Sequence, residues 1–139
     1  MNRVILSTNS HPDYQFLAPL TAILWATRTM YKPAVLCDKG SPELDFLDDS
    51  GMIDVCELEG PRLPNDRLAV KLARWYSYNS FPWMGFEEGD TLLLSDVDLW
   101  PIDGAFWNRN VTKRVTCFYG DAFQGKRHAT AGFRATCKA

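Results

Sequence analysis

Residues 90–102 read Asp-Thr-Leu-Leu-Leu-Ser-Asp-Val-Asp-Leu-Trp-Pro-Ile. The apolar run 92–94 is typical of a short strand that is buried on both faces. Pro101 ends the possibility of continued central pairing, because proline has no N–H to donate to a neighbouring strand. Asp96 and Asp98 therefore stand where a buried strand reaches the surface.

The two acids are separated by a single residue, which suggests that they act together. In an extended chain, side chains two positions apart point to the same side, so we expect Asp96 and Asp98 to face one site. Two carboxylates that close repel each other, and a divalent cation removes the conflict. Oxygen ligands suit a hard cation, so the pattern predicts a site for Mn²⁺ or Mg²⁺. The alternative is a pair of solvated acids that cap backbone N–H groups at a strand end.

The segment 92–98, Leu-Leu-Leu-Ser-Asp-Val-Asp, resembles the Asp-X-Asp signature of the GT-A fold glycosyltransferases, which take sugars from nucleotide-sugar donors. The resemblance implies a Rossmann-like GT-A fold of the α/β class, with a mainly parallel central sheet and helices on both faces. It also implies that Asp98 binds the metal on the donor diphosphate, that Asp96 supports the metal and the ribose, and that Val97 lies against the donor.

The order of elements before residue 90 agrees with that fold class. Strands are expected at 3–8, 33–37 and 53–58, and helices at 17–31 (with Pro19 starting or bending the helix), 41–51 and 65–78. In the first helix the pattern at Leu17, Leu20, Leu24, Thr27 and Tyr31 follows a helical spacing. The second has a strong start signal, Ser41-Pro42-Glu43, and an end signal at Gly51. Alternating strands and helices indicate a mainly parallel sheet.

After Pro101 the pattern changes. Residues 106–108 read as a turn or short helix, and 114–119 and 129–133 read as strands with little helix between them. We therefore expect a single GT-A-like domain, with a nucleotide-sugar-binding half at 1–100 and the start of an acceptor-binding half at 101–139. Residues 129–134 resemble the first acceptor-side strand of such enzymes. This leads us to expect a chain truncated at its C-terminus, or completed by a partner, that binds the donor but transfers sugar poorly.

Open parallel sheets bind ligands beyond the carboxyl ends of their strands. Those ends supply Thr8 and Asn9 after the first strand and Asp38 after the second. The resemblance implies that they lie near the base and ribose of the donor. The alternative is that they serve only as loop and turn residues, for which asparagine and aspartate are common.

Three cations follow a helical spacing within 65–78, namely Arg67, Lys71 and Arg74. Residues three and four apart share one helix face. Such a row usually means a solvated face, but this helix directly precedes the acid-pair strand and a diphosphate needs cationic partners. Arg67 and Lys71 are therefore our candidates for phosphate contacts.

The remaining candidates follow the acid pair. Asp121 is either a general base for an acceptor hydroxyl or a turn residue. His128 could complete a metal site, but we expect it to be a surface or core histidine instead. Trp100, Trp107 and Phe123 are core residues or stacking partners for an acceptor, which would be a sugar or a protein.

Composition narrows the range of partners. The chain has 139 residues, 46% of them hydrophobic, and a net charge of −2, which favours neither nucleic acid nor an anionic membrane as the main partner. No segment is long enough for a transmembrane helix. The four cysteines lack the spacing of a zinc or redox pair, so we expect reduced thiols and a cytoplasmic setting. They are Cys37, Cys56, Cys117 and Cys137.

Other functions share some of these features. A phosphohydrolase of the haloacid-dehalogenase type also has Asp-X-Asp at a strand end, although there the pair opens the fold. An ATPase would need a glycine-rich loop ending in Gly-Lys-Ser/Thr, which the sequence lacks. A nucleotide-sugar-binding module without catalysis is the alternative from a different class.

Overall fold

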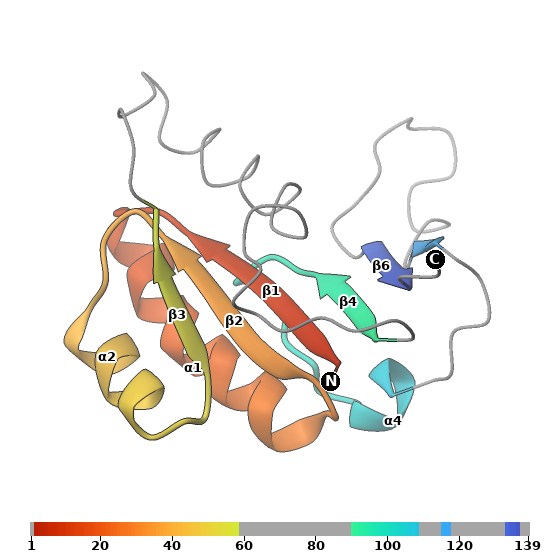
Figure 1. The fold of residues 1–139 in the computed structure, drawn as a ribbon. Coiled ribbons are helices and arrows are strands. Elements are labelled where there is room, and N and C mark those ends of the chain that lie inside the picture. Colours follow the sequence, from red (N-terminus) through yellow and green to blue (C-terminus); the bar gives the residue numbers. More distant parts are fainter. Residues whose placement is uncertain (1, 59–89, 109–114, 118–132, 137–139) are drawn as a thin grey trace, which may run out of the picture.

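The computed structural model describes residues 2–58, 90–108, 115–117 and 133–136. These residues form one six-stranded sheet in the order β3-β2-β1-β4-β6-β5, together with three helices (Figure 1). The strands are β1 (Arg3–Thr8), β2 (Lys32–Cys37), β3 (Asp54–Glu57), β4 (Thr91–Leu94), β5 (Val115–Cys117) and β6 (Phe133–Thr136). The helices are α1 (Pro12–Arg28), α2 (Pro42–Asp49) and α4 (Gly104–Trp107).

The first four strands are parallel, and the last two are not. β1 pairs with β2 on one side and with β4 on the other, and β2 also pairs with β3, all in parallel register. β6 then runs antiparallel to β4, and β5 runs antiparallel to β6. The prediction of a mainly parallel α/β sheet of Rossmann-like class is confirmed, and so is a change of pattern after residue 101.

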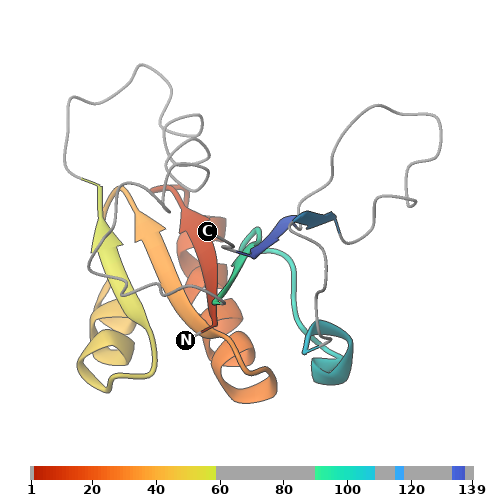
Figure 2. The same cartoon turned by 45° about the vertical axis from the view of Figure 1, so that its right-hand side comes forward.

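Both long helices lie on the same face of the sheet (Figures 1 and 2). Side chains alternate along each strand, so Val4, Leu6 and Val35 point toward the helices, where they pack against residues of α1 and α2. Ile5 and Leu36 point the other way and belong to a second buried cluster on the opposite face. Helices were predicted on both faces, and the helix predicted at 65–78 lies outside the described residues.

An aromatic cluster fixes α4 against α1. Trp25 lies edge-to-face against Tyr31 and against Trp107, with ring centroids 6.1 Å and 5.0 Å apart. Edge-to-face pairs contribute about 0.5–1.5 kcal/mol each beyond the area that they bury. Gly104 begins α4 at a point of close approach, because a Cβ there would lie 2.0 Å from the carbonyl oxygen of Arg28.

The most buried residues of α1 are not the leucines of its apolar pattern. The helix buries Ala18, Thr21, Ala22 and Trp25, whereas Leu20 is 40% exposed. Small residues at 18 and 22 let the helix backbone approach the sheet closely, which turns the leucines toward the flanks. The helix also begins earlier than expected, at Pro12, and Pro19 lies inside it.

The boundaries of α2 are as the sequence predicts. Ser41 caps the helix, with its hydroxyl accepting a hydrogen bond from the N–H of Leu44 at 3.3 Å. Pro42 occupies the first turn, where a missing N–H costs nothing. Gly51 follows the helix with φ of 73°, a conformation that favours glycine.

Ion pairs hold the amino ends of the first three strands together. Asp54 of β3 accepts hydrogen bonds from Arg3 of β1 and from Lys32 of β2, the latter at 2.6 Å from Nζ to Oδ1. Burial by itself would raise the pKa of Asp54, but the hydrogen bonds and charges of Lys32 and Arg3 outweigh it and hold the pKa below its usual value.

Among the helices that the structure describes, none has both the length and the apolar character needed to cross a membrane.

Candidate functional site

The candidate site lies where the chain order of the parallel strands reverses. β1 is the first strand, β2 follows on one side of it, and β4 comes later on the other side. The carboxyl ends of these strands point the same way (Figure 1). In open α/β sheets this reversal leaves a crevice in which ligands bind. Asp38 after β2 and Asp96 after β4 therefore flank the end of β1.

The loops after β1 and β2 are joined by a hydrogen bond. The backbone N–H of Ser10 donates to Oδ2 of Asp38 at 3.1 Å. Asn9 stabilises the same loop, because its Oδ1 accepts a hydrogen bond from the N–H of His11 at 3.0 Å. His11 in turn caps α1 through Nδ1, which accepts from the N–H of Asp13. The two predicted residues Asn9 and Asp38 thus lie at one edge of the sheet.

Asp38 has an unused acceptor. Its Oδ1 is buried and, within the described part of the chain, has no hydrogen-bond partner. A buried carboxylate oxygen without a partner costs free energy, so this atom favours a ligand that donates a hydrogen bond. Thr8, by contrast, is only 2% exposed, and its hydroxyl donates to the carbonyl oxygen of Asn9 at 3.2 Å. Its side chain stabilises the loop from within.

The predicted geometry of the acid pair is wrong. β4 ends at Leu94, and residues 96–99 form a turn in which the N–H of Leu99 donates to the carbonyl oxygen of Asp96 at 3.2 Å. Val97 and Asp98 are the central residues of this turn, so the alternation of an extended strand does not apply. Within this turn Val97 points inward: its side chain is 3% exposed and packs in the core.

The turn presents two carboxylates of different exposure. Asp96 is half-buried and Asp98 is exposed. The side chain of Val97 anchors the turn between them, so a donor contact by Val97 would have to come from its backbone N–H. A turn of four residues can still direct both carboxylates to one ligand, although by a different geometry from that expected.

Thr21 of α1 fixes the position of the turn. Its side chain is fully buried, and its hydroxyl donates a hydrogen bond to the carbonyl oxygen of Val97. At the other end of the segment, the N–H of Ser95 donates to the carbonyl oxygen of Ile5 in β1 at 3.0 Å. The turn is therefore attached both to the central strand and to the helix that covers it.

The donor set suits a metal that is shared with a ligand. Among the described residues, no group of three or more histidine, cysteine, aspartate or glutamate side chains is placed to hold a metal ion. Mg²⁺ is commonly bound by one or two carboxylates plus phosphate oxygens of the substrate, and a pair such as Asp96 and Asp98 meets that requirement.

Several predicted residues lie outside the described part of the chain. They are Arg67, Lys71, Arg74, Asp121, Phe123 and His128. Of the two tryptophans proposed to stack on an acceptor, Trp100 is 44% exposed, whereas Trp107 is 2% exposed in the aromatic cluster. The stacking role is therefore wrong for Trp107, because Trp25 and Phe106 already cover its rings.

The two described cysteine side chains support the prediction of thiols at their positions. Neither Cys37 nor Cys56 forms a disulfide. Burial, reinforced by the negative charges of Glu57 and Asp38, raises the pKa of Cys37 to about 12. This thiol beside the candidate site therefore stays protonated at neutral pH and is not a nucleophile.

Ser10 and Thr21 were not predicted as site residues. Ser10 contributes only a backbone N–H, which no side-chain pattern reveals. Thr21 lies on the buried side of α1 next to Ala22, and a polar residue on a core face is the one signal that could have indicated a buried partner.

Comparison of the sequence with models of known families and with curated proteins finds no match to either.

Proposed function

We propose that this chain is a glycosyltransferase of the GT-A type, which moves a sugar from a nucleotide-sugar donor to an acceptor hydroxyl on a sugar or a protein. The observation that supports the proposal most is the position of two sets of acidic groups beside β1. The buried Oδ1 of Asp38 lies on one side of that strand, and the turn with Asp96 and Asp98 follows the strand on the other side.

The proposed roles follow from the chemistry of each group. Asp38 can accept a hydrogen bond from a ribose hydroxyl or a base N–H through its unused Oδ1. Asn9 and the N–H of Ser10 hold the loop that places Asp38. On the other side, Asp98 would bind the divalent cation and Asp96 would support it.

The remaining proposed roles concern the negative charge of the leaving diphosphate and the proton of the acceptor hydroxyl. When bound, Mn²⁺ or Mg²⁺ neutralises charge that builds on the leaving diphosphate. Arg67 and Lys71 remain candidates to share that task, and Asp121 remains a candidate base for the acceptor hydroxyl. A cytoplasmic location also stays a prediction.

The experiment is a panel of nucleotide sugars incubated with the purified chain, with and without Mn²⁺ and with simple sugar acceptors. We expect manganese-dependent release of a nucleoside diphosphate, by transfer or by slow hydrolysis of the donor, and its loss in Asp98→Ala. Hydrolysis of phosphate monoesters in place of nucleotide sugars would favour the haloacid-dehalogenase alternative. Donor binding without any turnover would favour a binding module.

A further inference from the structure

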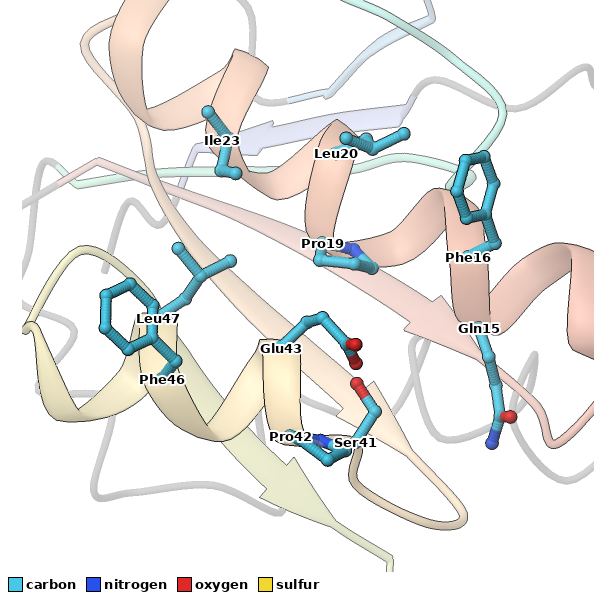
Figure 3. Close-up of a pocket in the computed structure, with 10 residues that line it drawn as sticks. All are labelled: Gln15, Phe16, Pro19, Leu20, Ile23, Ser41, Pro42, Glu43, Phe46 and Leu47. Carbon is cyan, nitrogen blue, oxygen red and sulfur yellow. The ribbon is translucent and has the colours of Figure 1, made fainter.

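A groove of about 880 Å³ separates α1 from α2 on the helical face of the sheet (Figure 3). Most of the side chains that line it are apolar, and they come from both helices. Figure 3 shows Phe16, Leu20 and Ile23 in a row along α1, with α2 across the groove. The groove plays no part in the proposed transferase site.

The sequence of α1 provides a second apolar stripe for this groove. The core face of the helix uses residues 18, 21, 22 and 25, whereas Phe16, Leu20 and Ile23 follow at i, i+4 and i+7 on a neighbouring face. Phe16 is 70% exposed, and Phe46 on α2 is 72% exposed. Two phenylalanines that open to solvent on both walls of a groove mark a surface for a partner.

The charges on α2 are negative, and Glu43 is the one among them that lines the groove, whereas Asp48 faces β3, where it accepts a hydrogen bond from the N–H of Val55. Residues 42–49 of α2 include four acids and no lysine or arginine: Glu43, Asp45, Asp48 and Asp49. Asp13 adds a further acid in the first turn of α1, whereas Arg28 is the last residue of α1 and Lys39 lies in the loop before α2. Figure 3 shows Glu43 reaching into the space between the helices. A partner that complements this surface is therefore basic.

The same charges exclude other occupants. A second copy of this chain that docked through the same face would set one acidic α2 against another, and an anionic membrane would also be repelled. A small ligand is a poor fit as well, because small-molecule sites bury most of the ligand surface, whereas the phenylalanines on both walls of this groove are more than two-thirds exposed. The eight residues of α2 span about 12 Å, which matches two turns of a helix.

We propose that the groove between α1 and α2 binds a short amphipathic helix of another protein, with apolar side chains at i and i+4 and lysine or arginine on its flanks. The apolar side chains pack between Phe16 and Phe46. A cation on the flank lies against Glu43. Helices bind grooves of this kind through such anchors.

The test uses a fluorescent helical peptide of leucine and lysine as the probe, and the same peptide with glutamate in place of lysine as its control. We expect salt-sensitive binding of the lysine peptide in anisotropy titrations and about tenfold weaker binding by Phe46→Ala. Phe16→Ala gives the same test from the opposite wall. Ile102→Ala is the matched control, because Ile102 is 76% exposed but lies outside the groove.

The proposal is supported if both phenylalanine variants weaken binding while their melting temperatures stay close to that of wild type. It is overturned if the lysine peptide does not bind, if the glutamate peptide binds equally well, or if Ile102→Ala weakens binding as much. Sedimentation showing a dimer that Phe46→Ala disrupts, or binding to anionic vesicles that Phe46→Ala weakens, would also overturn it.

Discussion

Replacing Thr21 by valine tests whether a hydrogen bond from α1 holds the acid turn in place. Valine keeps the shape of threonine but lacks the hydroxyl that donates to the carbonyl oxygen of Val97. Both residues are buried, so the carbonyl loses a partner where water does not replace it. A buried polar group left unsatisfied costs about 1–3 kcal/mol, and we expect Thr21→Val to lower the free energy of unfolding by that amount.

The assay is equilibrium denaturation, and two further variants make it specific. Thr21→Ser keeps the hydroxyl, so it should retain the hydrogen bond. Thr27→Val removes a hydroxyl that bonds within α1, to the carbonyl oxygen of Ile23 at 2.7 Å, on the exposed side. It should therefore cost less than about 0.5 kcal/mol. If Thr21→Val matches Thr27→Val, the inference that this bond holds the turn fails.

Three further predictions concern the frame around the site. Asp54→Asn removes the partner of the two cations at the amino edge and should cost roughly 1.5–3 kcal/mol near neutral pH. Because the pKa of Asp54 is held below its ordinary value of 3.8, the cost should shrink as pH falls through that lowered pKa, and a pH-independent cost in denaturation would contradict this. Gly104→Ala should destabilise by about 1–3 kcal/mol, since its Cβ would meet the backbone of α1, and an unchanged melting temperature would show that this contact is loose. In the native protein, Cys56 should react with iodoacetamide before Cys37, whose pKa is raised to about 12, and the reverse order by mass spectrometry would refute the stated burial.

Local signals predicted much of the frame. The strands at Arg3–Thr8 and Lys32–Cys37 are apolar runs that need no tertiary information, and Ser41 and Gly51 mark α2 through their own side-chain and backbone preferences. The face of α1 could not be read in the same way. Its leucines follow a helical spacing, but close packing against the sheet favours small residues such as Ala18. Which residues face the sheet therefore depends on how closely the helix approaches it.

In the candidate site, too, local sequence predicted some features, whereas others depend on tertiary contacts. Residue types at the strand ends correctly indicated that Asn9 and Asp38 would lie at one edge of the sheet. The turn at Asp96 and Asp98 was not predicted, because the inward packing of Val97 and its bond to Thr21 arise from contacts distant in sequence. Alternating polar and apolar residues fit both a strand end and such a turn.

The most direct test of the proposed function is calorimetric titration of nucleoside diphosphates into the chain with and without Mn²⁺. We predict manganese-dependent binding by wild type, its loss in Asp98→Ala, weaker binding by Asp96→Asn, and no change in Asp49→Ala, which removes an exposed acid on α2. Asp98→Ala should keep the wild-type melting temperature without ligand, since the side chain is exposed. Full manganese-dependent binding by both variants of the acid turn, or none by wild type, would contradict the proposal.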